Sequence, residues 1–381
     1  MLNRLKQLIS PRSKPERKQD LPDIVWVPPD KNQWKIPVLD VRPVTQTMVS
    51  TTTNEECAKN SLSYGRDDGT GFANDTPGIQ RTIPVDLAYR IDRVLAPGAL
   101  FIPAAMEHKW AIYYHGGRIL FVRSWMRKVV AAAQVECNNG VARLVSVMGT
   151  FAGDDEAEEF TIRTTDYLLR THALGLMFPA PLPPGFELEP KTAAVWCMNV
   201  FGKMASCATP QRVAAEIPDK PLRTYSLLHI AVAQGDTQAV GLHLQSGFPV
   251  DLLAGDGLAP LHWAFAQKST AMAEFLIQHG SPVDVRSAEG ATPLMTEVQA
   301  GKIENTKFLL DRGAEANAVD LRGFSSLHRA AELGHVELTL LLLKRGAHPD
   351  VMARGQTPLS LAEKRGHGEI VKLLSRKSEA S

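Results

Sequence analysis

"LAPLHWA", residues 258–264, is one of five similar segments in the C-terminal part of this 381-residue chain. Aligned without gaps, the segments share a leucine that recurs about every 33 residues. The segments are YSLLHIA (225–231), LAPLHWA (258–264), ATPLMTE (291–297), FSSLHRA (324–330) and QTPLSLA (356–362). The fixed period indicates stacked repeats, in which each unit buries its apolar face against its neighbours.

A second signature lies downstream and contains a glycine. It reads AEFLIQHGSPVD (273–284), TKFLLDRGAEAN (306–317) and LTLLLLKRGAHPD (338–350). Thr292 and Ser325 can cap a helix by accepting a hydrogen bond from a free backbone N–H. The prolines at 260, 293 and 358 suit the first helical turn. Glycine tolerates the left-handed conformation that ends a helix, so each unit is predicted to contain two helices joined by turns.

Together the two signatures resemble the ankyrin repeat, whose pattern is a turn, T-P-L-H-x-A, a second helix and G-A. The resemblance covers about residues 222–376 and implies five repeats in an all-α ankyrin repeat solenoid over residues 222–381. Such an array offers an extended concave surface. The resemblance therefore implies that this region binds another protein.

Three segments carry a histidine, namely His229, His262 and His328. Residues one repeat apart lie roughly 10 Å from one another, given the usual helix-packing distance. Zinc ligands must converge to about 2 Å from one ion, so these three side chains cannot share a metal. The resemblance implies that each imidazole bonds to backbone groups of its own and the neighbouring repeat. We predict structural histidines, no metal and no cofactor.

Some repeats depart from the pattern. The third has Met295, Thr296 and Glu297 in place of His-x-Ala, and the second has Lys268-Ser269 where the family usually has Gly-His. We expect repeats two and three to be the least regular and least stable. The last repeat has lost one residue in its turn, and its polar end, LLSRKSEAS, is typical of a C-terminal cap.

The region before the repeats is predicted to be an α+β domain spanning residues 21–221, after a basic flexible tail at 1–20. The segments 109–125 and 128–149 read as two hairpins, turning at Gly116-Gly117 and at Asn138-Asn139-Gly140, which together give an antiparallel β-meander. Helices are expected over 154–175, with a solvated acidic start, and over 190–206. The segment 83–95 fits a strand or a helix. The domain boundary is expected within 214–224, where Pro218 and Pro221 bracket charged residues.

The composition of the chain argues against several classes of partner and location. The net charge is +1, so no broad attraction to nucleic acid is expected. The four cysteines form no C-x-x-C pair, which fits a reducing compartment. No apolar run reaches the ~20 residues of a membrane span. We predict a cytoplasmic protein with no membrane span and no nucleic-acid partner. A faint likeness of residues 106–125 to uncharacterised bacterial proteins suggests a bacterial source.

The N-terminal region contains several groups that could carry chemistry. Glu107, His108, His115, Arg118 and Arg123 lie around one hairpin and could form an acid/base and anion-binding group. The alternative is a structural role, with Arg123 and Trp125 on one face and a cation–π pair or an edge ion pair there.

Two further stretches have alternative interpretations. His172 with Cys197 or Cys207 could form a Cys–His pair, although buried thiols are common. The loop 64–78 matches neither a P-loop nor an EF-hand, so a mobile surface loop is expected.

These observations favour an interaction scaffold, in which the repeats bind a partner protein and localise or regulate the N-terminal domain. One alternative is an enzyme with its active site in residues 21–221 and the repeats as a targeting arm. Another is a toxin-neutralising or stress-response module. The ankyrin family contacts ligands through turn tips and the ends of first helices, which implies partner-binding residues Asp256, Leu258, Trp263, Gln267, Glu289, Gln299, Leu321, Arg322, Phe324, Glu332, Leu333 and Arg354.

Overall fold

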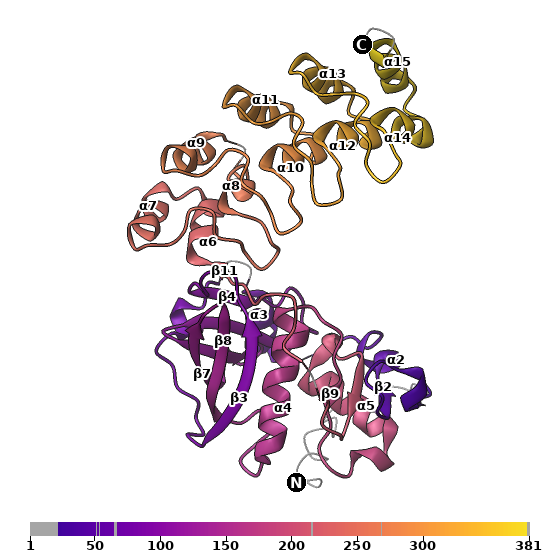
Figure 1. The fold of residues 1–381 in the computed structure, drawn as a ribbon. Coiled ribbons are helices and arrows are strands. Elements are labelled where there is room, and N and C mark those ends of the chain that lie inside the picture. The colour runs from indigo at the N-terminus through magenta and orange to yellow at the C-terminus, as the bar shows by residue number, and fades with distance from the viewer. Residues whose placement is uncertain are drawn as a thin grey trace. The chain divides into compact units, whose positions relative to one another are not determined.

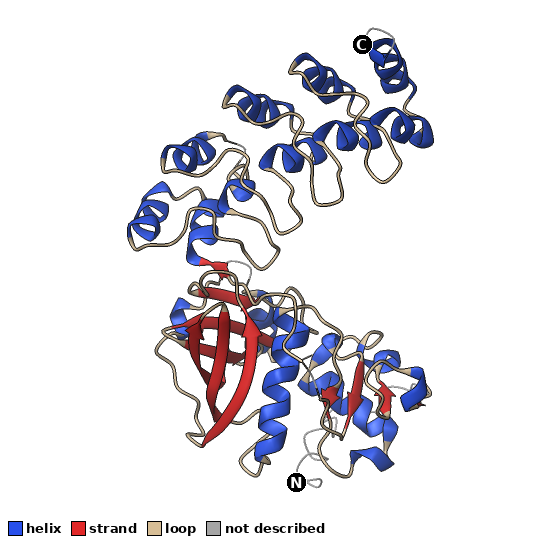
Figure 2. Ribbon diagram, viewed as in Figure 1, coloured by secondary structure: helices blue, strands red, loops and turns tan. Residues whose placement is uncertain are grey.

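The computed structural model describes residues 22–50, 52, 54–64, 67–214, 216–267 and 269–378. The basic tail predicted at residues 1–20 lies outside them. The chain divides into two compact units, Met1–Ser226 and Leu227–Ser381. The first is rich in strands and the second is helical (Figure 2).

A seven-stranded antiparallel sheet forms the larger part of the N-terminal unit, in the order β11-β4-β5-β6-β7-β8-β3. Its strands are β3 (Thr82–Arg90), β4 (Gly98–Phe101), β5 (Trp110–His115), β6 (Arg118–Arg123), β7 (Lys128–Asn138), β8 (Val141–Gly149) and β11 (Tyr225–Ser226). Both predicted hairpins are confirmed. The ambiguous segment 83–95 is mainly strand, because β3 pairs with β8 along its length.

The hairpin turns follow from their sequences. Gly116 and Gly117 have φ values of 57° and 73°, and Asn139 and Gly140 have 50° and 74°. A two-residue turn with positive φ at both positions matches the right-handed twist of the flanking strands. Glycine and asparagine enter this region more easily than other residues.

A second, smaller sheet has the order β1-β2-β10-β9. It contains β1 (Trp26–Val27), β2 (Val38–Asp40), β9 (Ala180–Pro181) and β10 (Cys207–Thr209). Strands from near the start and near the end of the unit meet here, with β9 and β10 parallel and the other pairs antiparallel. No local sequence pattern predicted this sheet.

The helices of this unit are α2 (Arg42–Thr45), α3 (Glu55–Leu62), α4 (Glu158–Leu168) and α5 (Pro190–Val200), and α4 continues as a π-helical turn over Leu169–Ala173. The expected solvated acidic start of α4 is confirmed for Asp154, Asp155, Glu158 and Glu159, which are exposed, but not for Glu156. Glu156 is 1% exposed and accepts hydrogen bonds from the N–H groups of Phe151 and Ala152 and from the Thr161 hydroxyl. The helix therefore begins only after this buried carboxylate.

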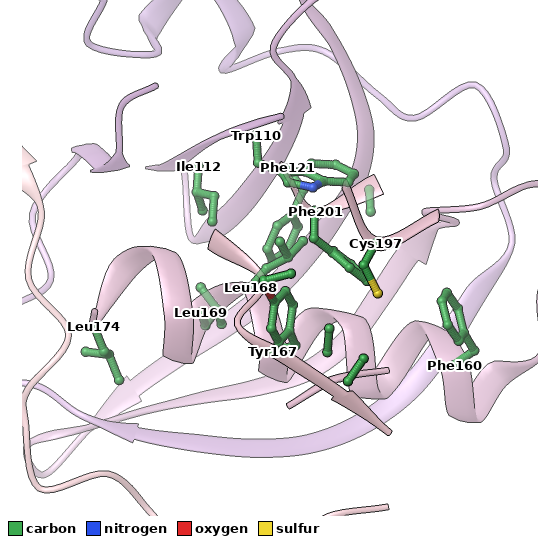
Figure 3. Packing of buried hydrophobic residues seen from close by; sticks show 14 of the residues in the cluster. Trp110, Ile112, Phe121, Phe160, Tyr167, Leu168, Leu169, Leu174, Cys197 and Phe201 are labelled. Atoms are coloured by element: carbon green, nitrogen blue, oxygen red, sulfur yellow. The ribbon is translucent and has the colours of Figure 1, made fainter. Parts of the chain in front are cut away.

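The main core of the unit joins the large sheet to α4 and α5. Figure 3 shows Trp110 and Phe121 of the sheet close to Tyr167, Cys197 and Phe201. The indole N–H of Trp110 donates to the carbonyl of Val200 at 2.8 Å. A buried indole needs such a partner, so this bond links β5 to the end of α5.

Ten helices form the second unit over its described residues. They are α6 (Leu227–Gln234), α7 (Thr237–Gln245), α8 (Pro260–Trp263), α9 (Ala271–Gln278), α10 (Pro293–Gln299), α11 (Ile303–Asp311), α12 (Ser326–Leu333), α13 (Val336–Lys344), α14 (Pro358–Arg365) and α15 (Gly368–Ser378). First and second helices form two rows, with long turns between successive repeats (Figure 1). The shared leucine is fully buried in the first four repeats and half-buried in the last, Leu359.

Of the two repeats expected to be irregular, only the second is. Helix α8 has four residues, whereas α10 has seven and its Thr292 hydroxyl accepts from the N–H of Met295. The other four repeats have a glycine with φ between 69° and 79° just after the first helix, at 235, 301, 334 and 366. The second repeat has Lys268 at this position in the sequence.

Candidate protein-binding surface

The motif histidines hold consecutive repeats together. The Nε2–H groups of His229, His262 and His328 donate to the carbonyls of Leu258, Ala291 and Gln356, at 3.1, 3.1 and 3.3 Å. The Nδ1 atoms of His262 and His328 accept from backbone N–H groups at the start of their own helices, at 3.3 and 3.1 Å. The predicted structural role is confirmed.

Burial keeps these imidazoles neutral. It lowers the pKa of His229 to about 4, against hydrogen bonds to carbonyls that act in the opposite direction. Burial also lowers the pKa of His262 and His328. A neutral ring can accept at Nδ1 while it donates at Nε2, as this bridge requires. Among the residues that the structure describes, no group of His, Cys, Asp and Glu is arranged to hold a metal ion.

The turns between repeats form a ladder of backbone hydrogen bonds. Three turns, 254–258, 287–291 and 320–324, each close with an N–H to carbonyl bond of 2.9 Å. Neighbouring turns are joined by Ala288 N–H to Gly257 and by Leu321 N–H to Glu289. The last turn, Ala353–Gln356, is one residue shorter, and Arg354 lies at its tip with a φ of 49°.

Comparison with known families agrees with this geometry. The family model for ankyrin repeats, in three copies, matches residues 228–320 and 298–381. Residues 228–381 are ankyrin repeats. Ankyrin repeats are a protein–protein interaction module. No curated protein matches the chain.

Most of the predicted partner-binding residues of the ankyrin repeats are exposed. Asp256, Gln267, Glu289, Gln299, Leu321, Arg322, Leu333 and Arg354 are exposed, and Leu258, Trp263, Phe324 and Glu332 are half-buried. Leu321 and Leu333 are 78% and 45% exposed. Sequence reasoning missed Val319 and Met352, two further exposed apolar residues next to the turn tips. The motif leaves their positions variable, so no sequence signal indicated them.

Gln267, one of the predicted partner-binding residues, has a structural role. The Gln267 amide donates to the carbonyl of Ala233 at 2.6 Å and packs against Gly235. In later ankyrin repeats the histidine of Gly-His takes this place, since His367 packs on Gly334 and donates to the Glu332 carbonyl. Gln267 therefore substitutes for the missing Gly-His of the second repeat.

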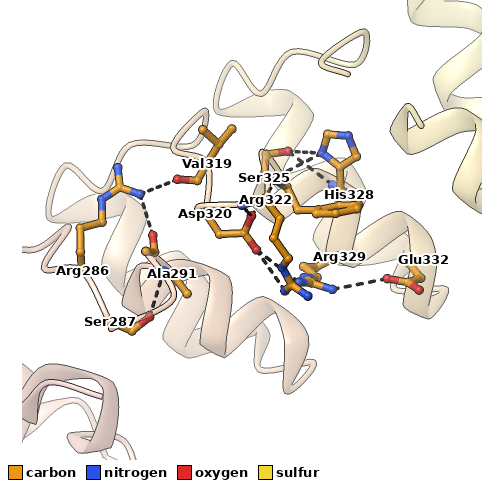
Figure 4. Close-up of polar contacts among 12 residues, drawn as sticks. Arg286, Ser287, Ala291, Val319, Asp320, Arg322, Ser325, His328, Arg329 and Glu332 are labelled. Carbon is orange, nitrogen blue, oxygen red and sulfur yellow. Dashed lines mark hydrogen bonds and ion pairs between the residues drawn. The ribbon is translucent and has the colours of Figure 1, made fainter. Parts of the chain in front are cut away.

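In the fourth repeat, two arginine side chains lie over one phenylalanine ring. Figure 4 shows the polar contacts around them. The Phe324 ring lies 5.7 Å from the Arg322 guanidinium and 5.2 Å from that of Arg329. The Asp320 carboxylate pairs with Arg322 at 3.2 Å and with Arg329 at 3.4 Å. Burial alone would raise the pKa of Asp320, but hydrogen bonds from the Phe324 and Arg322 N–H groups, together with the Arg322 guanidinium, lower it.

Glu332 extends this network. Its carboxylate pairs with Arg365 at 2.8 Å and with Arg329 at 3.6 Å, and the bond from Arg365 lowers its pKa. Arg322 and Arg329 are thus held over Phe324 before any partner arrives. Side chains that are already ordered lose less conformational entropy on binding.

Beside Trp263, the ankyrin repeats contain a hollow of about 290 Å³. It is lined by His262, Trp263, Phe265, Ala266, Glu297, Ala300, Lys302 and Asn305. Glu297 was noted in the sequence only as a departure from the motif. The sequence feature that could have indicated this hollow is a carboxylate at a position where the pattern has alanine.

A cavity of about 520 Å³ in the N-terminal unit contains none of the candidate residues from that region. Several arginines line it, and their guanidiniums are engaged within the protein. Arg163 donates to the carbonyls of Thr209 and Pro210 at 2.7 Å, and Arg170 pairs with Asp166 at 2.7 Å. Arg143 pairs with Asp86.

The candidate acid/base and anion-binding residues around the first hairpin form hydrogen bonds with backbone groups. His115 bonds to the carbonyl of Asp68 at 2.8 Å, and Arg118 donates to that of Ala73 at 2.6 Å. His108 accepts from the N–H of Ala104, and Glu107 from that of Ser50. Arg123 donates to the carbonyls of Val200 and Asn199.

The expected Arg123–Trp125 pair is wrong. Arg123 lies over Trp110 at 4.8 Å, on the adjacent end of β5, while Lys109 covers Trp125 at 3.9 Å. Strand β6 ends at Arg123, so the alternation of faces does not continue to Trp125. These contacts favour a structural role for the whole group.

The possible Cys–His pair has unfavourable electrostatics. Burial raises the pKa of Cys197 far above its usual value and that of Cys207 to about 12. Burial also lowers the pKa of His172 to about 3. Because the thiolate is the nucleophile, protonated thiols and a weakly basic imidazole argue against covalent catalysis.

The described part of the loop 64–78 (Tyr64 and residues 67–78) packs against the sheet, contrary to expectation. Tyr64 and Phe72 are buried, and Phe72 stacks on Tyr113 at 5.6 Å. Asp67 pairs with Arg127, and Gly69 has a φ of 80° with its α-carbon directly over Tyr113. The loop's two aromatic side chains are buried with sheet residues, which outweighs its polar composition.

Proposed function

We propose that the ankyrin repeats bind a partner protein through the turn tips and first-helix ends, and that this contact localises or regulates the N-terminal unit. The observation that carries the proposal is the ordered group Arg322–Phe324–Arg329 beside the exposed Leu321 and Leu333. Aromatic and arginine side chains supply most of the binding energy at protein interfaces.

The composition of the turn tips also supports an interface. The fold requires no large apolar group at these tips, yet Leu321 is 78% and Met352 68% exposed. Exposed charges such as Glu289 and Arg354 surround them. An apolar centre with a polar rim is the usual arrangement of a protein-binding patch. Since the four cysteines are unpaired, we place this contact in the cytoplasm.

The test starts with capture of partners by the chain with and without residues 222–381. The captured protein is then titrated against the variant Arg322→Ala/Phe324→Ala. The loss of two central contacts should weaken binding by roughly 2 kcal/mol or more. Because Phe324 is half-buried and packs edge-on against His328 at 5.4 Å, the melting temperature should fall slightly.

Two single variants separate binding from folding. Leu321→Ala removes an exposed side chain from the proposed surface, and Leu242→Ala removes a 57% exposed one from α7. We expect weaker binding for the first and unchanged binding for the second. Equal affinity for both, and for the double variant, would show that the partner binds elsewhere.

A further inference from the structure

The third ankyrin repeat contains a polar pair where the other repeats are apolar. The Asn305 amide donates to Oε2 of Glu297 at 2.7 Å. By alignment, Glu297 corresponds to Ala231, Ala264, Ala330 and Ala362, and Asn305 to Ala239, Met272, Leu338 and Ile370. Glu297 is only 6% exposed. The same repeat therefore carries two coupled substitutions, both from apolar to polar.

The Glu297 carboxylate of the pair is buried within the stack. Burial raises the pKa of Glu297, although the bond from Asn305 and the charge of Lys302 act in the opposite direction. A buried carboxylate is unfavourable unless its hydrogen bonds and charge are compensated. Four repeats of this chain show that alanine suits the position. Local departures from a consistent pattern are expected at functional or strained sites.

Glu297 lines the hollow of about 290 Å³. Trp263, Phe265 and Ala266 line it from the second repeat, where α8 ends at Trp263. Trp263 is half-buried and lines the hollow. Lys302, at the same hollow, has an exposed side chain. The hollow thus combines aromatic walls with one acidic group.

We propose that this hollow accepts a lysine or arginine side chain from the partner protein. The cationic head pairs with the Glu297 carboxylate, which Asn305 holds in place, and the aliphatic stem lies against Trp263 and Phe265. Long basic side chains bury their stems on apolar surface, and aromatic rings attract their charge. The exposed Lys302 moves its ammonium into solvent when the partner's cation enters. The inference rests on the proposed function of the repeats.

The first test measures stability without a partner. The double variant Glu297→Ala/Asn305→Leu gives the third repeat the same pair as the fourth, Ala330 and Leu338. If the pair serves binding, the thermal midpoint of the repeats stays unchanged or rises. A fall of several degrees, about 1 kcal/mol or more for a domain of this size, would show a structural role and overturn the inference.

The second test uses a phage-displayed library of short random peptides, selected on the full chain. The peptides that bind should share one lysine or arginine. Its replacement by norleucine should weaken binding to the natural chain about tenfold or more, the scale of a lost charge-assisted contact. Glu297→Gln keeps the hydrogen bond to Asn305 but removes the charge, and it should weaken the basic peptide by the same factor. Equal binding by Glu297→Gln would overturn the inference.

Comparison with Leu321→Ala distinguishes this inference from the proposed function. Peptides weakened by Leu321→Ala but not by Glu297→Gln contradict only the cation site. Peptides affected by neither variant contradict the proposed surface as well. For peptides that occupy the hollow, norleucine replacement and Glu297→Gln should not be additive, because both remove the same contact.

Discussion

The two units of this protein differ in how far apart in the chain the hydrogen-bond partners of their buried polar groups lie. In the ankyrin repeats, the histidine bridges join residues 28 or 29 positions apart, and the same bond recurs from repeat to repeat. In the N-terminal unit, Thr45 donates to Ala205 across 160 positions and Thr209 to Pro37 across 172. Periodic contacts can be predicted from a sequence pattern, whereas single long-range contacts cannot.

Histidine shows the same contrast. His262 and His328 have partners at both ring nitrogens. His172 is equally buried, but its Nε2 has no hydrogen-bond partner among the described residues. The pattern of the repeat specifies partners for the first two. Only the surrounding core determines the environment of the third. The predictions below test this difference, from the largest effect to the smallest.

The largest effect should come from the N-terminal core. Trp110→Ala removes a fully buried ring that contacts Arg123 and Phe151 and donates to Val200. We expect the unfolding free energy of that unit to fall by about 3–5 kcal/mol. Calorimetry should show a lower first-unit transition and an unchanged repeat transition. The half-buried Trp34 provides a control, Trp34→Ala, with a smaller effect. A joint shift of both transitions would mean that the two units unfold as one.

The next effect depends on pH and belongs to the repeats. Burial lowers the pKa of His229 to about 4 in the folded state, against 6.5 in the unfolded chain. As the pH falls below 6.5, the unfolded chain binds the proton first, so stability is lost until about pH 4. The loss from His229 alone reaches about 3 kcal/mol. His262 and His328 act in the same direction.

Denaturant unfolding at several pH values measures this effect. His229→Gln should give a shallower pH dependence between 6.5 and 4, and His348→Gln, at an exposed site, should leave the dependence unchanged. An identical slope for the natural chain and His229→Gln would show that His229 is not the group that titrates.

The smallest effect should come from a variant that restores the histidine missing from the third repeat. Met295 stands where other repeats have the bridging histidine, and the Phe324 carbonyl across the junction corresponds to the carbonyls that accept in those repeats. Met295→His should add a bond to that carbonyl and stabilise the repeats by about 1 kcal/mol. Met295→Leu, which adds no donor, should change little. Equal melting temperatures for the two variants would mean that the third junction has a different geometry.

The sequence by itself determined the ankyrin repeats, the role of their histidines, the shortened last turn and the two N-terminal hairpins. All of these depend on residues that are close in the chain or recur at a fixed spacing, so local propensity and period suffice. The sequence also distinguishes the second repeat, where Lys268 replaces the glycine of the other repeats.

Only the tertiary structure decided the small sheet, the buried position of Glu156, the placement of Arg123 over Trp110 and the hollow beside Glu297. In each case the outcome depends on which distant side chain fills the adjacent space. Burial energy is non-directional and rewards any apolar surface removed from water, so a local pattern cannot specify the partner. The complete packing of the chain selects it.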